Sequence, residues 1–444
     1  MAAFDDLMAF TRDTEALAQV AGRLSWDQET VMPRGAGAQR AEEMGAMESV
    51  LHARRTDPRI ADWLAAAQAP DAAGAAQLRL IGRSYERAVR VPADLATALA
   101  RLTSQSQGVW AEARADNDFA AFAPVLTEVV TLKREEGAAL ADGGDVYDAM
   151  LDTFEPDATA AELQAMFDAM RDGLVRLRLQ ALDGASRSAI TGTFDEAAQM
   201  RLSRELAERF GYDFTRGRID KAVHPFSSGS GDDARITTRT SADDPFNCLY
   251  STIHEVGHAC YEQGVDRAWH LTPVGHGVSM GVHESQSRIY ENQLGRSRAF
   301  CHFLYGRMRD TFGEIGVQDE AAQSGPFVAV VERDRLRWHD GRNRVLVDKL
   351  RLPVPPQQNA EVVEPGNHAL QFHAVHEEDR YRNFTFSNSV QKSVLEVLLV
   401  GSHSLSPYGS PVDRAVISSL MYGCIAVRFP PRNRSNLSHR NNFS

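Results

Sequence analysis

The residues with the clearest potential for chemistry lie just past the middle of the chain. They are His254, Glu255 and His258 in the segment H-E-V-G-H, and Glu284, which follows the second histidine by 26 residues. On a helix, residues four apart share a face, so both imidazoles can bind one metal ion. With Glu284 as a third ligand from the next helix, one position stays open for water, as in a catalytic zinc site. Glu255 lies beside that face and is placed to take a proton from the bound water.

Two other glutamates compete for the position of third ligand. Glu262 follows His258 by four residues on the same helix, and Glu291 follows Glu284 by seven. Three ligands from one helix would crowd a tetrahedral ion, so a carboxylate from a second helix is favoured. Because Glu284 and Glu291 share a helical face, Glu291 could instead orient a histidine ligand. Zinc is the default ion for two histidines and one glutamate, and cobalt or manganese could serve.

The segments around this motif are predicted mostly as helices. Thr193-Phe-Asp-Glu196 is a capping box and predicts a helix that stops at Gly211. Another helix is predicted from about Ala158 to Ala181. Its apolar face, expected to pack into the core, consists of Leu163, Met166, Met170, Leu174 and Leu177.

One segment breaks the helical pattern just before the metal motif. Residues 233–240 are rich in β-branched side chains and follow the turn-prone residues 227–233, which predicts a short strand or hairpin. A strand edge beside a metal site could hold an extended peptide through main-chain hydrogen bonds.

Composition excludes several classes of protein. A net charge of -12 argues against a nucleic-acid binder, and no apolar run approaches the ~20 residues that a membrane span requires. The first residues are acidic and lack a basic region, so no secretory signal is expected. The four cysteines have no C-x-x-C spacing, which favours free thiols in a reducing cytoplasm.

The sequence changes character near residue 320. Residues 1–320 carry a net charge of -16, and residues 321–444 carry +4. Asparagine occurs three times in the first segment and nine times in the second, where capped amphipathic helices are hard to find. We therefore expect a helical body over residues 1–320 and a divergent, partly disordered tail over 321–444. A spliced or out-of-frame reading of the gene is the preferred interpretation of this tail.

Five segments together resemble the carboxypeptidase Taq family. Three are signatures: residues 233–237 (D-A-R-I-T), residues 254–264 (H-E-V-G-H-A-C-Y-E-Q-G) and residues 283–292 (H-E-S-Q-S-R-I-Y-E-N). The opening residues 24–33 and the linker 223–229 are also similar to that family.

The resemblance implies a cytosolic metallocarboxypeptidase, mostly helical, with a deep active-site groove, acting on peptides as a homodimer. It implies that His254, His258 and Glu284 hold the metal. Glu255 would then act as the general base and pass its proton to the leaving amine.

A carboxypeptidase also needs a cation for the free carboxylate of its substrate. Arg235, with Thr237, is the best candidate because a guanidinium binds carboxylates through two hydrogen bonds. His276 is a further candidate for contact with the substrate. The weaker arginines, and the histidines expected to be packed or to support a ligand, are Arg239, Arg288, Arg296, His270 and His283.

The chain departs from the family after these signatures. The later patterns I-R-x-x-A-D and G-x-x-Q-D-x-H-W are missing: Gln318-Asp319 lacks the His-Trp, and Trp338-His339 stand in the opposite order. The missing segments are where the family's carboxylate-binding arginine would lie. Two alternatives to a carboxypeptidase therefore stay open: an inactive metal-binding homologue, and an oligoendopeptidase or aminopeptidase built on the same metal helix.

Overall fold

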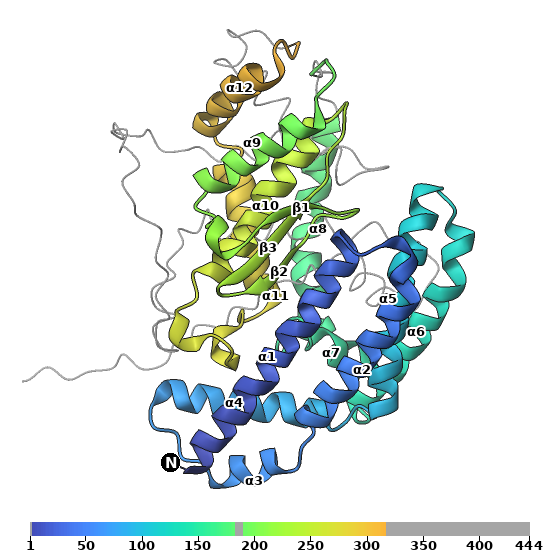
Figure 1. Ribbon diagram of the computed structural model, residues 1–444, viewed down its shortest axis with the longest axis vertical. Helices are drawn as coiled ribbons and strands as arrows, with labels where there is room; N and C mark the ends of the chain where they lie inside the picture. Colours follow the sequence, from blue (N-terminus) through green and yellow to red (C-terminus); the bar gives the residue numbers. More distant parts are fainter. Residues whose placement is uncertain (1, 183–189, 317–444) are drawn as a thin grey trace, which may run out of the picture.

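The computed structural model describes residues 2–182 and 190–316, which form a predominantly helical protein with one small sheet (Figure 1). The mostly α-helical fold predicted from the sequence is confirmed. The predicted boundary at residue 320 and the segment 321–444 lie outside the described residues. Within the two described ranges, none of the helices combines the length and the apolar character that crossing a membrane requires.

The first part of the chain is a set of packed helices, which occupy the lower and right-hand parts of Figure 1. Helix α2 packs along α5, and α5 packs along α6. Leu7, Ile60 and Ile81, from three different helices, form a small buried cluster. Helix α1 also contacts strand β2, so it connects these helices to the part of the chain that carries the metal motif. The elements are α1 (Ala2–Thr30), α2 (Gly37–Arg55), α3 (Arg59–Ala66), α4 (Ala72–Ala88), α5 (Ala93–Ala115), α6 (Phe119–Ala141) and α7 (Val146–Leu151), with a short 3-10 turn η1 (Arg34–Ala36).

Both helices predicted in the middle of the chain are present. The first is α8 (Ala160–Leu182), and the five residues of its predicted apolar face are half-buried. The second is α9 (Glu196–Arg209), which begins after Asp195 and not after Thr193. The prediction of the cap was wrong because the Asp195 carboxylate accepts the hydrogen bond of the Ala198 N–H, at 2.7 Å, and an aspartate caps as well as a threonine. Gly211 has a φ of +96° and ends the helix as predicted.

A three-stranded sheet precedes the metal motif in order β1-β3-β2. Its strands are β1 (Ile219–Lys221), β2 (Ser227–Ser230) and β3 (Asp233–Thr238), after a 3-10 turn η2 (Phe214–Arg216). The predicted strand is therefore confirmed as β3. It pairs in parallel with β1 and antiparallel with β2, so both of its edges are already hydrogen-bonded. The expectation that this strand offers an edge to a peptide was wrong, because its hairpin partner β2 occupies one edge and β1, from earlier in the chain, occupies the other.

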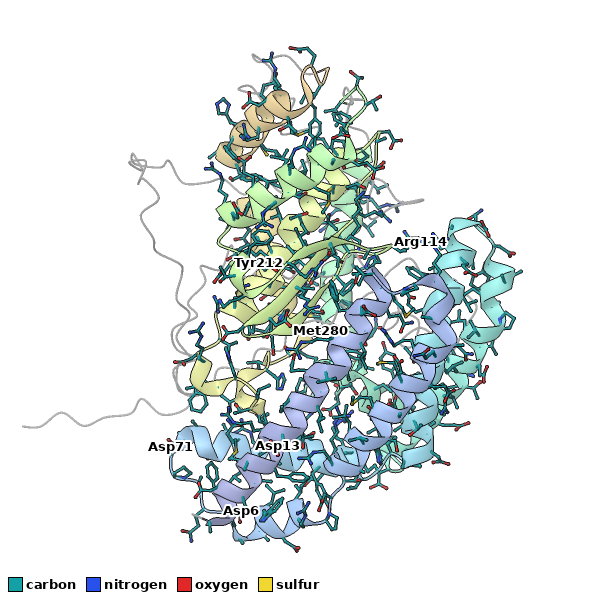
Figure 2. The ribbon with its side chains drawn as sticks, in the orientation of Figure 1. Asp6, Asp13, Asp71, Arg114, Tyr212 and Met280 are labelled. Atoms are coloured by element: carbon teal, nitrogen blue, oxygen red, sulfur yellow. The ribbon has the colours of Figure 1, made fainter. Side chains whose placement is uncertain are left out.

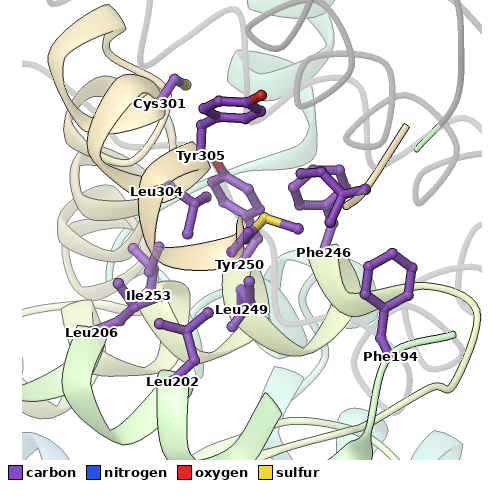
Figure 3. Close-up of a cluster of buried hydrophobic side chains, with 12 residues drawn as sticks. Phe194, Leu202, Leu206, Phe246, Leu249, Tyr250, Ile253, Cys301, Leu304 and Tyr305 are labelled. Carbon is purple, nitrogen blue, oxygen red and sulfur yellow. The ribbon is translucent and has the colours of Figure 1, made fainter. Parts of the chain in front are cut away.

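The largest core cluster joins three helices of the upper part, α9, α10 (Pro245–Gln263) and α12 (Arg298–Phe312) (Figure 3). Leu206 of α9, Ile253 of α10 and Leu304 of α12 are fully buried in it. On another side α10 packs against β3, where Ile236 is fully buried. The hydroxyl of Tyr212, labelled over the sheet in Figure 2, donates to the Ala234 carbonyl oxygen at 2.6 Å. These contacts fix the rotation of α10 about its axis, and with it the direction of its imidazoles. The remaining elements are η3 (Arg267–Trp269), η4 (Pro273–Gly275), α11 (Met280–Arg288) and the π-helical turn η5 (Ile289–Leu294).

Candidate metal centre

Helix α10 carries three of the predicted site residues. It begins after Asp244, whose carboxylate accepts hydrogen bonds from two backbone N–H groups of the first turn, and Pro245 occupies the first helical position. His254, Glu255 and His258 follow in the helix interior, far from either fraying end. The imidazole rings of the two histidines lie side by side with centroids 4.9 Å apart. The spacing of four therefore places both rings on one face, as the sequence predicts.

Glu284 comes from the neighbouring helix α11 and completes a group of three. Its Oε2 atom lies 3.2 Å from Nε2 of His258 and 3.5 Å from Nε2 of His254. The three ligand atoms are within 4.8 Å of one another and could hold a metal ion. Bonds of about 2.0–2.2 Å at tetrahedral angles would separate neighbouring ligands by ~3.4 Å. Two of the three separations match that value, so the donor set fits a tetrahedral cation.

Gly257, between the two histidines, allows α10 and α11 to touch. A Cβ at this position would lie 2.5 Å from the Cα of Ser287 and 3.1 Å from its nitrogen. Gln286 strengthens the crossing by donating from Nε2 to the Gly257 carbonyl oxygen at 3.0 Å. Sequence reasoning did not single out this glycine. The available signal was a glycine in a buried helix interior, where it costs about 1 kcal/mol relative to alanine.

The variant Gly257→Ala should therefore lose both stability and metal affinity. The added methyl meets backbone atoms that cannot rotate away, so α11 must shift and carry Glu284 with it. We expect the free energy of unfolding to fall by about 1–3 kcal/mol. Denaturant unfolding and metal titration would measure the two effects. Gly306→Ala on α12 is the control, since a Cβ there meets no atom within 4 Å; equal behaviour of the two variants would contradict this account of Gly257.

A carboxylate orients the first histidine. Nδ1 of His254 lies 3.0 Å from Oε2 of Glu291, which fulfils the alternative role foreseen for this glutamate. Two guanidiniums hold Glu291 in turn: Arg288 Nη1 at 3.0 Å and Arg296 Nη2 at 3.1 Å. Arg288 also reaches Glu284, with Nε 2.6 Å from Oε1. A network of opposite charges therefore holds the His254 ring and the Glu284 carboxylate, both candidate metal ligands, in place together.

The second histidine is held differently. Nδ1 of His258 lies 2.7 Å from Nδ1 of His283, and Nε2 of His283 lies 2.8 Å from Oε1 of Glu262. Glu262 therefore lies outside the group of three residues that could hold a metal ion, and Glu284 is the carboxylate that meets both imidazoles. His283 occupies the position between Glu262 and His258, in the supporting role that the sequence suggested for it.

Burial and neighbouring charges set the protonation of the site. Glu255 is only 6% exposed, and burial raises its pKa to about 7; a divalent cation nearby would favour the ionised form. Burial also lowers the pKa of His258 to about 4. For Glu284, burial opposes ionisation, but Arg288 and His254 outweigh it and hold the pKa well below its usual range. Glu284 thus offers a carboxylate and His258 a neutral ring, the forms that bind metals.

Arg235, the predicted carboxylate anchor, is engaged within the sheet. Its Nε and Nη2 atoms bind the Asp233 carboxylate at 2.7 and 3.0 Å, and its guanidinium lies 4.4 Å from the centre of the Trp26 ring. Asp233 also binds Arg23 of α1 at 2.8 Å. The guanidinium is therefore pre-oriented by a carboxylate partner and by an aromatic face.

The other two predicted substrate residues lie elsewhere. Thr237 is fully buried, and its hydroxyl accepts from the Phe226 N–H at 2.8 Å and donates to its carbonyl oxygen, so it holds the segment before β2. Nε2 of His276 lies 2.9 Å from Oε2 of Glu15 on α1. In the described part of the chain, the hydrogen bonds given above for Arg235, Thr237 and His276 join them to Asp233, Phe226 and Glu15, and not to His254, His258 or Glu284.

A buried glutamate that sequence reasoning missed holds the start of α11. Glu155 is 6% exposed, and its Oε2 accepts a hydrogen bond from the Gly281 N–H at 3.3 Å. The carbonyl oxygen beside it, of Phe154, accepts from the Met280 N–H at 2.9 Å (Met280 is labelled in Figure 2). A carboxylate at a helix N-terminus is favourable because the N–H groups there are unpaired. The partners are more than a hundred residues apart, so no local pattern indicates them.

Known proteins are similar to this chain in sequence. Thermostable carboxypeptidase 1 of Thermus thermophilus is 39% identical over 335 residues, which cover 71% of this chain and 66% of that protein. Carboxypeptidase 1 of Bacillus subtilis is 30% identical over 352 residues, covering 76% of this chain and 69% of the relative. This chain therefore matches about two thirds of the length of these relatives.

The fold is also similar to those of carboxypeptidases whose structures have been solved. Metallocarboxypeptidase 1 of Trypanosoma cruzi matches with a TM-score of 0.66 and 31% identity, covering 75% of this chain and 68% of that one. An M32 carboxypeptidase of Deinococcus radiodurans matches with a TM-score of 0.64 and 33% identity, covering 74% and 67%. The model of the family described as carboxypeptidase Taq (M32) metallopeptidase matches residues 6–337. The chain belongs to the carboxypeptidase Taq family of metallopeptidases.

Proposed function

We propose that this chain is a metal-dependent carboxypeptidase, which hydrolyses peptides and releases their C-terminal amino acids. The observation that carries the proposal is the convergence of two imidazole nitrogens and one carboxylate oxygen within 4.8 Å, with Glu255 adjacent on the same helix. Family membership and the names of the relatives support the same reaction.

His254, His258 and Glu284 would hold the ion, with zinc as the default and cobalt or manganese as alternatives. A bound divalent cation would polarise the scissile carbonyl and lower the pKa of a water molecule beside it. The Glu255 carboxylate takes the proton of the attacking water on one of its oxygens. It then delivers that proton to the nitrogen of the leaving amino acid. Because Glu255 is buried, little solvent competes for this proton.

Substrate recognition requires a cation for the terminal carboxylate. We assign this role to Arg235, whose guanidinium would exchange one of its contacts with Asp233 for the substrate. His276, which is exposed and lies beside Glu15, would contact the peptide, while Thr237 would support the site by holding Phe226 in place before β2. Two further proposals rest on the family resemblance: the protein acts in the cytoplasm, and it is a homodimer. None of the three described cysteines is part of a disulfide bond, which is compatible with a reducing compartment.

The purified chain should release the C-terminal amino acid from an N-blocked dipeptide, and a chelator should abolish this release. Restoring zinc, cobalt or manganese should restore it, because the metal sits on three ligands and can exchange. The same dipeptide with a C-terminal amide should be cleaved far more slowly, since it lacks the charge that Arg235 would bind. Mass spectrometry of the products would measure each rate.

The outcome also separates the alternatives. Cleavage of an internally quenched peptide blocked at both ends would favour an oligoendopeptidase. Binding of one equivalent of metal without any cleavage would favour an inactive homologue. The absence of the two later family patterns is the sequence observation that raised this alternative.

A further inference from the structure

A hydrogen-bonded row of three side chains, Glu262, His283 and His258, ends at the second histidine of the candidate metal centre. Glu262 Oε1 lies 2.8 Å from Nε2 of His283, and Nδ1 of His283 lies 2.7 Å from Nδ1 of His258. The far nitrogen of His258, Nε2, faces Oε2 of Glu284 at 3.2 Å. All three side chains are at least mostly buried, with exposed fractions of 13%, 21% and 17% for Glu262, His283 and His258.

The two imidazoles meet edge to edge. Their planes are within 19° of parallel and their centroids are 4.8 Å apart, much farther than the 2.7 Å between the two Nδ1 atoms. The nitrogens therefore point at each other nearly in the ring planes, which is the geometry of an N–H···N hydrogen bond. The His283 ring is confined on its sides by Tyr261, with centroids 4.7 Å apart, and by Gly277, where a Cβ would come within 3.1 Å of the ring.

The direction of the hydrogen bonds follows from the chemistry of the groups. An ionised carboxylate only accepts, so His283 must donate to Glu262 from Nε2–H. A neutral imidazole has one N–H, and Nδ1 of His283 is then a bare acceptor. His258 must consequently donate from Nδ1–H. This leaves the lone pair of His258 on Nε2, the atom that belongs to the group of ligands.

We propose that His283 and Glu262 are positioning residues that select the metal-binding tautomer of His258 and hold its ring, an inference that rests on the proposed metal-dependent function. The carboxylate of Glu291 orients His254 in the same way, through a direct hydrogen bond with Nδ1 of that ring. At His258 the carboxylate acts through an intervening neutral ring. Removing the relay frees His258 to carry its proton on Nε2, where it blocks the metal.

Three substitutions of His283 distinguish this role from simple packing. His283→Asn places an amide oxygen where Nδ1 was, and can still accept from His258. His283→Gln places its amide near the former Nε2, and can reach Glu262 but not His258. His283→Phe fills the ring space and offers no acceptor. The tautomer role predicts that metal affinity falls in the order wild type, Asn, then Gln and Phe together, with a loss of about 10–100-fold for the last two. A packing role predicts that Phe is the best of the three.

The measurement is the dissociation constant of the metal-free, full-length protein for zinc, by competition with a chromophoric chelator. His302→Gln on α12, an exposed histidine, is the matched control and should bind zinc like the wild type. Far-ultraviolet circular dichroism and thermal unfolding of each metal-free variant would confirm the fold. Zinc affinity of His283→Phe within twofold of the wild type would overturn the proposal. A wild-type chain that binds no zinc would instead refute the proposed function.

A double-mutant cycle supplies a test that does not depend on any one variant. Glu262→Met keeps the volume of the side chain but removes the acceptor, so it should also weaken zinc binding. Because both residues act through one chain of hydrogen bonds, the double variant with His283→Phe should lose no more than His283→Phe alone. Fully additive losses would mean that the residues act separately and would contradict the relay.

Discussion

The variant Glu255→Gln should remain folded and bind one equivalent of metal, yet lose turnover by several orders of magnitude, about 10²–10⁴-fold. The substitution keeps the size of the side chain and leaves His254, His258 and Glu284 in place. It removes the only group beside them on α10 that can take a proton from water and return it to the leaving nitrogen. The loss should appear in kcat, with KM for an N-blocked dipeptide nearly unchanged.

The control for this variant is Glu86→Gln, an exposed glutamate on α4, which should turn over like the wild type. Metal content by atomic spectroscopy shows whether the site is intact. Wild-type kcat in the Glu255→Gln protein with full metal content would remove this glutamate from the mechanism.

The variant His258→Ala should lose the metal itself. Its Nε2 is one of three converging donor atoms, and two remaining ligands cannot hold a divalent cation against dialysis. The buried carboxylate of Glu284 would also lose its neighbouring imidazole nitrogen at 3.2 Å. We expect less than a tenth of an equivalent of zinc after dialysis, and no release of C-terminal amino acids.

Here His302→Ala is the matched control, because it removes an exposed imidazole from α12 and should retain one equivalent of zinc. Circular dichroism of the dialysed proteins would show whether the overall helix content is unchanged. A His258→Ala protein that keeps a full equivalent of tightly bound metal would mean that the ligands lie elsewhere.

Individual helices could be predicted because the patterns that indicate them, apolar spacing and capping residues, lie within the helix or at its ends. Helices α8 and α9 follow from apolar spacing, and Gly211 ends α9 because a glycine adopts a positive φ at little cost. The error of two residues at the start of α9 came from choosing between Thr193 and Asp195, both of which can cap a helix. Of the three strands, the sequence predicted only β3. The sequence of one segment does not show which other segments pair with it.

The sequence by itself determined that two imidazoles share a helical face and that Glu255 lies beside them, because a helix repeats every 3.6 residues. The tertiary structure decided which carboxylate joins them. By sequence spacing alone, any of three glutamates could have been the third metal ligand: Glu284, Glu291 or Glu262. The contact of α10 with α11 at Gly257 brings Glu284 to the imidazoles. That same packing turns Glu291 toward His254 and Glu262 toward His283. Spacing along one helix fixes direction, whereas the distance between two helices depends on side chains that meet only after the chain has folded.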